Sequence, residues 1–294
     1  MTRHFHIVDV FAEQRYSGNP LAVVINDDFP AVETMQQIAA EMNFSETTFV
    51  NRAPEKNGGF RVRVFTPTRE IAFAGHPVLG TAWVIRHHVA PDTPAPLTLN
   101  LAVGPIPVTF EDSAEETETA WFQAPQTALG ATCAPGPVAA ALGIAPEDID
   151  TGSPVQQVSA GVSALIVPLR NLDALRRCKL DLDAFAPLTM QGFPSLVYLF
   201  CQQTRQAQND LSARFFFEAN GVREDPATGN GAAFLGAYLL EHRVFCRPGL
   251  ALRIEQGHEV NRPSLVLLRA ETLAGNHVVN VGGRVIPVVT GTLL

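Results

Sequence analysis

Two short segments constrain this chain more than any other feature, because each places a titratable residue directly before a proline and an apolar run. They are Gly75-His76-Pro77-Val78-Leu79-Gly80 and Glu224-Asp225-Pro226-Ala227-Thr228-Gly229. Proline suits the first helical turn, so we expect buried helices over Val78–His88 and Pro226–Leu240, each capped by the titratable residue. The cap lies beside unpaired backbone N–H groups and the positive end of the helix dipole. Two such helix starts facing one another would form an anion pocket, which favours an enzyme.

Composition excludes several classes of protein. The 294 residues suffice for two domains with a core each, and 46% hydrophobic with 17% charged residues excludes wholesale disorder. A net charge of −8 argues against nucleic acid as a partner, although helix starts can still hold a small anionic metabolite. No apolar run reaches the ~18 residues that cross a bilayer, and Met1–Val10 alternates like a strand rather than a signal peptide. We therefore expect a cytoplasmic protein with no membrane partner.

The order of predicted elements repeats weakly along the chain. A helix is expected at Thr34–Met42, an exposed acidic turn at Glu111–Glu118, and a turn at Gly161 that parallels the one at Gly18. Strands are expected at Phe5–Val10, Leu21–Ile25, Thr47–Val50, Phe60–Phe65, Leu97–Val103, Ile106–Phe110, Thr119–Phe122, Ala164–Pro168, Ser195–Phe200, Ala213–Phe217 and Val278–Val289.

This repeat predicts two similar lobes. The boundary lies in Ala124–Gly136, a stretch rich in Pro, Gly, Ala and Thr. We expect an N-terminal lobe over residues 1–123, to which 280–294 returns, and a C-terminal lobe over 124–279.

Glu46 is the strongest single candidate for chemistry. It lies in Asn43-Phe44-Ser45-Glu46-Thr47-Thr48-Phe49-Val50, between an amphipathic helix and a β-branched strand. Apolar neighbours raise a carboxylate's pKa, and a base tuned toward neutrality can move protons to and from carbon. The alternative interpretation is an exposed glutamate at the start of a strand.

Asp225 and His76 each have a structural alternative as well. Aspartate is a favoured helix cap, and a histidine at a loop end is often simply hydrogen-bonded there. A helix N-terminus disfavours imidazolium, so we expect His76 to be neutral. Gly229 and Gly231 lie inside the second apolar run, where glycine is unfavourable and often indicates close approach by a ligand or another backbone.

The sequence indicates no metal or cofactor. His4 and His6 share a strand face, but no third ligand is evident, so we expect no metal site. There is no Walker loop, no GxSxG and no convincing dinucleotide fingerprint. The four cysteines lie away from both helix starts and have no CxxC spacing, which predicts reduced structural thiols rather than a two-cysteine racemase.

Several motifs together resemble the PhzF-like phenazine biosynthesis family. They occur in order over nearly the whole chain: Ser17-Gly18-Asn19-Pro20-Leu21-Ala22-Val23-Val24, Ser45-Glu46-Thr47, Phe73-Ala74-Gly75-His76-Pro77, Glu224-Asp225-Pro226-Ala227-Thr228-Gly229, and Gln256-Gly257 with Arg262-Pro263-Ser264. The resemblance implies the α+β diaminopimelate epimerase-like fold, with two pseudosymmetric lobes that each wrap a curved, mostly antiparallel sheet around a central helix. It also implies a cleft between the lobes and no cofactor.

The resemblance further implies isomerisation of trans-2,3-dihydro-3-hydroxyanthranilate, in which one glutamate moves a proton between ring carbons. By motif, that base is Glu46, with His76 and Asp225 as polar partners that position the substrate or relay the proton. Substrate-binding positions are then Ser45, Gly75, Gly229 and Asn230. This chain has Asn230-Gly231 where many relatives have Ser-Ala, and that departure bears on the substrate.

We therefore expect a cofactor-independent isomerase that acts on a small carboxylate and assembles as a homodimer. Two alternatives remain open at this point. One is a non-catalytic small-molecule-binding protein with the same two-lobed architecture, and the other is an epimerase or racemase with a different substrate.

Overall fold

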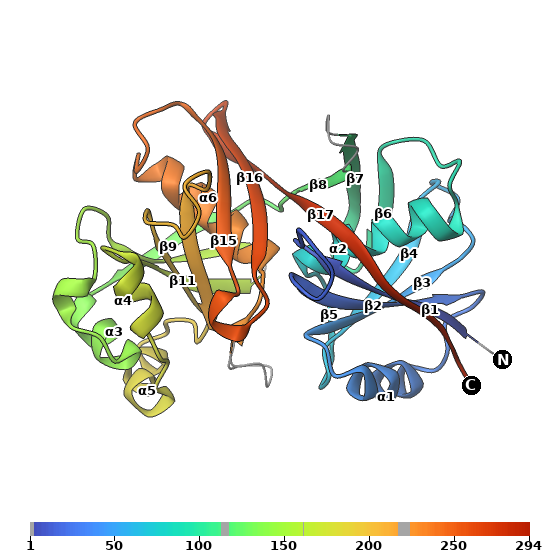
Figure 1. Cartoon of the computed structure of the whole chain (residues 1–294), viewed down its shortest axis with the longest axis horizontal. Helices are drawn as coiled ribbons and strands as arrows, with labels where there is room; N and C mark the ends of the chain where they lie inside the picture. Colours follow the sequence, from blue (N-terminus) through green and yellow to red (C-terminus); the bar gives the residue numbers. More distant parts are fainter. Residues whose placement is uncertain (1–2, 113–117, 161, 217–223) are drawn as a thin grey trace. The chain divides into compact units, whose positions relative to one another are not determined.

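Strands dominate the computed structural model, which describes residues 3–112, 118–160, 162–216 and 224–294 (Figure 1). The expected α+β class is confirmed. The chain divides into two compact units, Met1–Gln123 with Gly282–Leu294, and Ala124–Val281. Gly161, the end of the expected strand at Phe217, and most of the acidic turn 111–118 lie outside the described residues.

The first unit is a ring of paired strands. It contains β1 (Arg3–Val10), β2 (Asn19–Asn26), β3 (Glu46–Asn51), β4 (Phe60–Phe65), β5 (Glu70–Ile71), β6 (Leu97–Leu101), β7 (Gly104–Asp112), β8 (Glu118–Gln123) and the C-terminal part of β17 (Asn276–Leu293). Pairing runs β1–β2–β3–β4–β6–β7–β8 and returns through β17 to β1. Most neighbours are antiparallel, whereas β2–β3 and β4–β6 are parallel.

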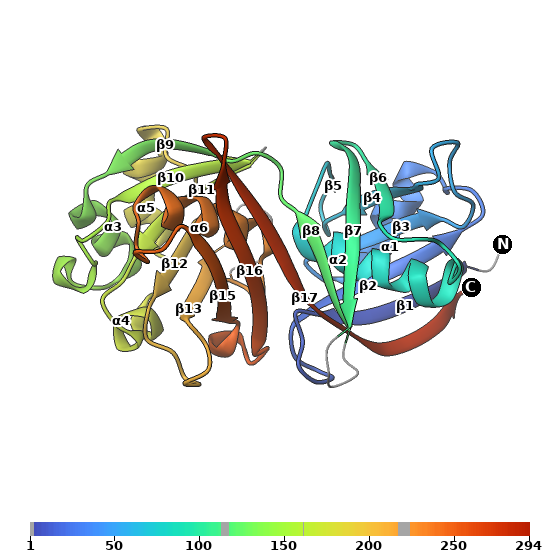
Figure 2. The same ribbon diagram turned by 90° about the horizontal axis from the view of Figure 1, so that it is seen from above.

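Helix α2 (Gly75–Val84) is the core of this ring. Nine of its ten residues are buried, and it contacts β1, β2, β3, β6, β7 and β8 (Figure 2). A helix that is hydrophobic on every face is stable only where other elements cover every face, and the strands of the ring do this for α2. Helix α1 (Val32–Met42) packs on the other face of β2 and β3, where Met35 and Ala39 contact Val24, Phe49 and Phe65.

The start and end of α2 differ from the prediction of Val78–His88. Ala74 is extended and is the N-cap, so the helix begins at Gly75 and His76 is its second residue. Pro77 still falls within the first turn, where its missing N–H costs nothing. After Val84 the backbone continues as a π-helix over Ile85–Val89.

The second unit contains one sheet with helices on both faces. Its strands are β9 (Ala128–Cys133), β10 (Val155–Ala160), β11 (Val162–Pro168), β12 (Val197–Cys201), β13 (Leu211–Phe216), β14 (Glu224–Asp225), β15 (Gly249–Gln256) and β16 (Ser264–Leu273). Pairing runs β9–β10–β11–β12–β13–β15–β16, with β11–β12 and β13–β15 parallel. Its helices are α3 (Pro135–Leu142), α4 (Leu172–Arg177), α5 (Leu182–Met190) and α6 (Gly229–Glu241), with 3-10 turns at Pro146–Asp148 and His258–Val260.

Burial on both faces explains why the central strands are continuously apolar. In β12, Val197 and Leu199 belong to the core under α3, α4 and α5. Phe200 points the other way, with its ring 5.8 Å from that of Tyr238 on α6. A half-exposed strand would alternate with polar residues, whereas a covered one does not.

Helix α6 begins later than the sequence predicts, so the assignment of Asp225 as its cap is wrong. Thr228 is the N-cap and Gly229 the first helical residue. Asp225 lies in β14, where it pairs with Phe215 of β13. The residue before a proline is biased toward extended backbone, and here the strand pairing uses that bias.

None of the helices in the described ranges combines the length and the apolar character needed to cross a membrane.

Candidate active site

Glu46 is directed toward α2 by strand alternation. On β3, Phe49 packs under α1, so Glu46 and Thr48 share the opposite face. Thr48 Oγ1 lies 2.8 Å from Thr81 Oγ1 of α2, which ties this face to the helix. Glu46 is 6% exposed, so its interpretation as a surface glutamate is wrong. A buried carboxylate needs polar partners, and a side chain near the start of α2 is one of them.

His76 is that partner. Its Nε2 atom lies 3.5 Å from Oε2 of Glu46, and the two side chains are 4% and 8% exposed. Burial lowers the pKa of His76 to about 3, so the ring is neutral at neutral pH. The sequence predicts a neutral ring, but it attributes this to the helix terminus, whereas the cause here is desolvation.

Asn19 completes this group, and the sequence analysis did not single it out. It is fully buried at the start of β2, and its Nδ2 atom lies 3.3 Å from Nδ1 of His76. Gly18 precedes it with φ +68°, and a Cβ at that position would lie 2.4 Å from the carbonyl oxygen of Val10. The Ser17–Pro20 segment was interpreted as a turn and as part of a family motif, without a role for Asn19 in the site. One signal for a site residue was available: a polar amide follows a tight glycine turn directly, at the first position of a buried strand.

Close packing fixes where α2 lies on the strands. An added methyl group at Gly80 would lie 2.6 Å from the Leu21 side chain and 2.9 Å from that of Val10. Leu21 pairs with Glu46 across the parallel β2–β3 ladder. The helix that carries His76 is thus held against the strands that carry Asn19 and Glu46.

Asp225 is buried within a second polar group, in the second unit. The Thr228 hydroxyl donates to its carboxylate. Gln256 Nε2 donates to the Asp225 carbonyl at 2.9 Å and to Thr228 Oγ1 at 3.2 Å, while its Oε1 accepts the Thr228 N–H at 3.3 Å. The Tyr198 hydroxyl lies 3.5 Å from that same Oε1. Burial, and then the charge of Asp225, raise the pKa of Tyr198, so the phenol is neutral.

The residue before Asp225 is anchored by an arginine. The Arg214 guanidinium donates to both carboxylate oxygens of Glu224, at 2.9 and 2.7 Å. The same guanidinium donates to the carbonyls of Leu175 and Cys178 at the end of α4. Planar, bidentate pairs of this kind are the geometrically specific ones, so they fix β14 and with it Asp225.

Gly231, near the start of α6, serves packing. A Cβ at Gly231 would lie 2.4 Å from the ring of Tyr198, so the close approach there is by a side chain, not by a ligand or another backbone. Gly229 and Gly75 are the buried first residues of α6 and α2. Asn230 and Ser45 are half-buried. Whether the two helix starts face one another stays a prediction.

The two buried thiols, Cys178 and Cys201, have environments that suppress thiolate formation. All four cysteines are free. Burial raises the pKa of Cys178 to about 12 and that of Cys201 to about 11. A nucleophilic or basic cysteine requires a lowered pKa, so these two are structural.

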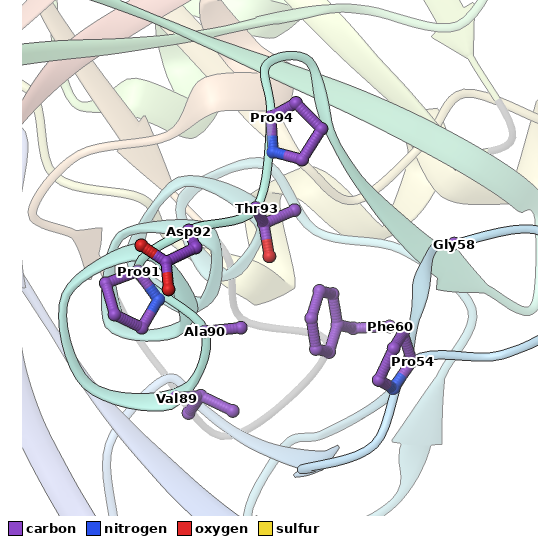
Figure 3. A pocket seen from close by; sticks show the side chains of 9 residues that line it. All are labelled: Pro54, Gly58, Phe60, Val89, Ala90, Pro91, Asp92, Thr93 and Pro94. Carbon is purple, nitrogen blue, oxygen red and sulfur yellow. The ribbon is translucent and has the colours of Figure 1, made fainter.

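A separate hollow of about 520 Å³ lies on the first unit (Figure 3). It is lined by two loops: Pro54, Gly58 and Phe60 on one side, and Val89, Ala90, Pro91, Asp92, Thr93 and Pro94 on the other. None of the predicted site residues lines it. Across the described ranges, no cluster of three or more His, Cys, Asp or Glu side chains could hold a metal ion.

Known proteins identify the family. The sequence model of the phenazine biosynthesis-like proteins matches residues 8–291. The chain belongs to this family. The resemblance drawn from the motifs is thereby confirmed.

Named relatives in this family are isomerases. A trans-2,3-dihydro-3-hydroxyanthranilate isomerase of Pseudomonas aeruginosa is 35% identical over 90% of this chain and 89% of its own. An uncharacterized isomerase of Mesorhizobium japonicum is 34% identical over 99% of both chains. A PhzF-family phenazine biosynthesis protein from Bacillus anthracis superposes with a TM-score of 0.90 at 25% identity, covering 100% of this chain and 99% of its own. This PhzF-family chain is therefore an isomerase.

Proposed function

We propose that this PhzF-family protein is a cofactor-independent isomerase in which Glu46 moves a proton between two carbons of a small carboxylate. The observation that carries the proposal is the buried pair of Glu46 and neutral His76, 3.5 Å apart. The Glu46 carboxylate takes the proton as a carbon–hydrogen bond breaks, and it returns a proton to another carbon of the same substrate. No electrons leave the substrate, so the reaction needs no redox partner. A positioned base of this kind contributes about 10²–10⁴-fold to rate.

A single carboxylate fits better than two thiols. Burial raises the pKa values of Cys178 and Cys201, which disfavours the thiolate form of both. A racemase that uses two cysteines needs one of them as thiolate. This disfavours the epimerase alternative of that type.

The proposed substrate is trans-2,3-dihydro-3-hydroxyanthranilate or a close analogue. The support is the activity in the name of the Pseudomonas aeruginosa relative, at 35% identity. By motif, Ser45, Gly75, Gly229 and Asn230 contact the substrate and Asp225 positions it. Asn230 presents an amide, which donates and accepts, so it suits a carboxylate or a hydroxyl of the ligand. A homodimer and a cytoplasmic location stay predictions.

Deuterium exchange tests this function. The purified protein is incubated in heavy water with trans-2,3-dihydro-3-hydroxyanthranilate and a panel of small carboxylates, and carbon-bound deuterium is measured by mass spectrometry. We expect uptake into product that does not occur without protein. Uptake into a different carboxylate alone would overturn the substrate and keep the reaction class. Binding without uptake in any compound would identify a non-catalytic binding protein.

A further inference from the structure

Asn19 faces the side of the His76 ring that is opposite to Glu46. Its amide nitrogen lies 3.3 Å from Nδ1, while Glu46 Oε2 lies 3.5 Å from Nε2. The two ring nitrogens of His76 therefore meet neighbours of different hydrogen-bonding character. All three side chains are buried, so bulk water does not decide between the tautomers.

The chemistry of the neighbours selects one tautomer of the neutral ring. An amide NH₂ group can only donate, so Nδ1 must accept and carries no proton. A proton on Nε2 also suits the side that faces Glu46, because an ionised carboxylate oxygen only accepts, although the 3.5 Å contact itself is not a hydrogen bond. The hydrogen bond from Asn19 to Nδ1 therefore assigns the proton of the neutral ring to Nε2. A hydrogen bond to one ring nitrogen is the usual means by which proteins set the state of the other.

We propose that Asn19 is a positioning residue that holds His76 as the Nε2–H tautomer, which makes His76 a hydrogen-bond donor beside Glu46. The inference rests on the proposed function, in which Glu46 is the base. A ring nitrogen that already carries a proton cannot accept one from Glu46. The proton taken from the substrate therefore remains on Glu46 until it returns to carbon, and His76 does not relay it.

The Nε2–H group of His76 is available to donate a hydrogen bond. Its contact with Glu46 lacks hydrogen-bond geometry, and no described residue accepts from it. A buried donor without an acceptor is unfavourable, because its interaction with water is lost and not replaced. This loss is offset if the group donates to an oxygen of the substrate, and a carboxylate or hydroxyl oxygen is the chemical class that fits.

The tautomer can be measured without any substrate. Protein with isotope-labelled histidine is examined by heteronuclear NMR at neutral pH, and the His76 ring signals are assigned by their loss in His76→Gln. We expect a neutral ring with the proton on Nε2. A proton on Nδ1 would overturn the proposal. Because this reading comes from the wild-type protein, it decides the tautomer whether or not any variant folds.

Asn19→Asp tests the role of the amide. A carboxylate at this position accepts from Nδ1, so the proton moves to Nδ1 and the pKa of His76 rises. Unchanged ring signals in the folded variant would contradict the positioning role. Asn26→Asp is the matched control, since Asn26 is buried at the other end of β2 and donates to the Val24 and Val50 carbonyls. It should leave the His76 signals as they are.

These outcomes separate the inference from the proposed function. A protein that shows the Nε2–H tautomer but no deuterium exchange retains the role of Asn19 and loses the role of Glu46. Deuterium exchange that depends on Glu46, together with a proton on Nδ1 of His76, retains the role of Glu46 as base and overturns the role of Asn19. In the active enzyme, Asn19→Asp should lower kcat more than it raises KM, because it changes a donor rather than the shape of the site.

Discussion

His76 Nε2 lies 3.5 Å from Glu46 Oε2, with both side chains almost wholly removed from solvent. This relationship joins the first turn of a central helix to the first residue of a strand. It also joins residues of two separate motifs. Burial of a carboxylate beside a neutral imidazole is unfavourable for folding alone, and such arrangements concentrate at functional sites.

Acid should destabilise the protein through His6. Burial, then the charges of His88 and His4, lower the pKa of His6 to about 4. The unfolded chain therefore binds the proton more readily, so stability is full above about pH 6.5 and falls as the pH drops toward 4. His6→Phe keeps the stacking on His88, 4.2 Å away, and removes this titration. Urea unfolding between these pH values should show a shallower loss in the variant, and equal slopes would contradict the assignment.

Gly231→Ala should destabilise the second unit by about 1–3 kcal/mol, because the added methyl group overlaps the Tyr198 ring. Gly136→Ala in α3 is the matched control, since nothing lies within 4 Å of its Cβ. That variant should gain about 0.4–1 kcal/mol from the reduced entropy of the unfolded chain. Chemical denaturation measures both. Equal effects at the two positions would show that the Tyr198 contact does not require glycine.

Asp225→Ala should cost about 1–3 kcal/mol, because the buried Thr228 hydroxyl loses its acceptor. Asp225→Asn retains an acceptor oxygen and should cost less. A double-mutant cycle with Thr228→Ala separates the loss of this hydrogen bond from other effects of removing the Asp225 carboxylate. We expect the cost of Asp225→Ala to shrink in the Thr228→Ala background, whereas an unchanged cost would mean that the carboxylate acts on something else.

The sequence predicts those helices and strands whose own residues determine their type, without help from tertiary contacts. The apolar runs at α2 and α6 and the strands β1 to β4 follow from periodicity and turn residues. It misses β9, because Ala128–Cys133 lies in a stretch of Pro, Gly and Thr typical of a linker, and its pairing with β10 is a tertiary effect. It places Asp225 at a helix cap, because an aspartate before a proline is equally compatible with a helix N-cap and with an extended residue in a short strand.

The site was predictable only in part for a similar reason. The Glu46 and His76 positions carry motif signals, but their mutual distance depends on the β3–α2 packing at Thr48 and Thr81. Asn19 was hidden because turn chemistry explains asparagine after glycine without any site. Gly231 was attributed to close approach by a ligand or another backbone, because one sequence does not reveal that the Tyr198 ring fills the space.

Removal of the thiols should leave catalysis largely intact. We expect a variant with Cys178→Ala, Cys201→Ala, Cys133→Ser and Cys246→Ser to retain deuterium exchange, with a lower unfolding midpoint from the two buried positions. The exchange rate and the thermal midpoint are measured on the same preparation. A folded variant without exchange would restore a thiol mechanism.

Deuterium exchange by Glu46→Gln tests the central claim most directly, because this change keeps the shape of the side chain and removes the proton acceptor. Glu41→Gln, an exposed glutamate of α1, is the matched control and should exchange like the wild type. We expect Glu46→Gln to fold, to bind the carboxylate with little change in affinity, and to lose turnover by about 10²–10⁴-fold. Near-wild-type exchange by Glu46→Gln would show that Glu46 is not the base.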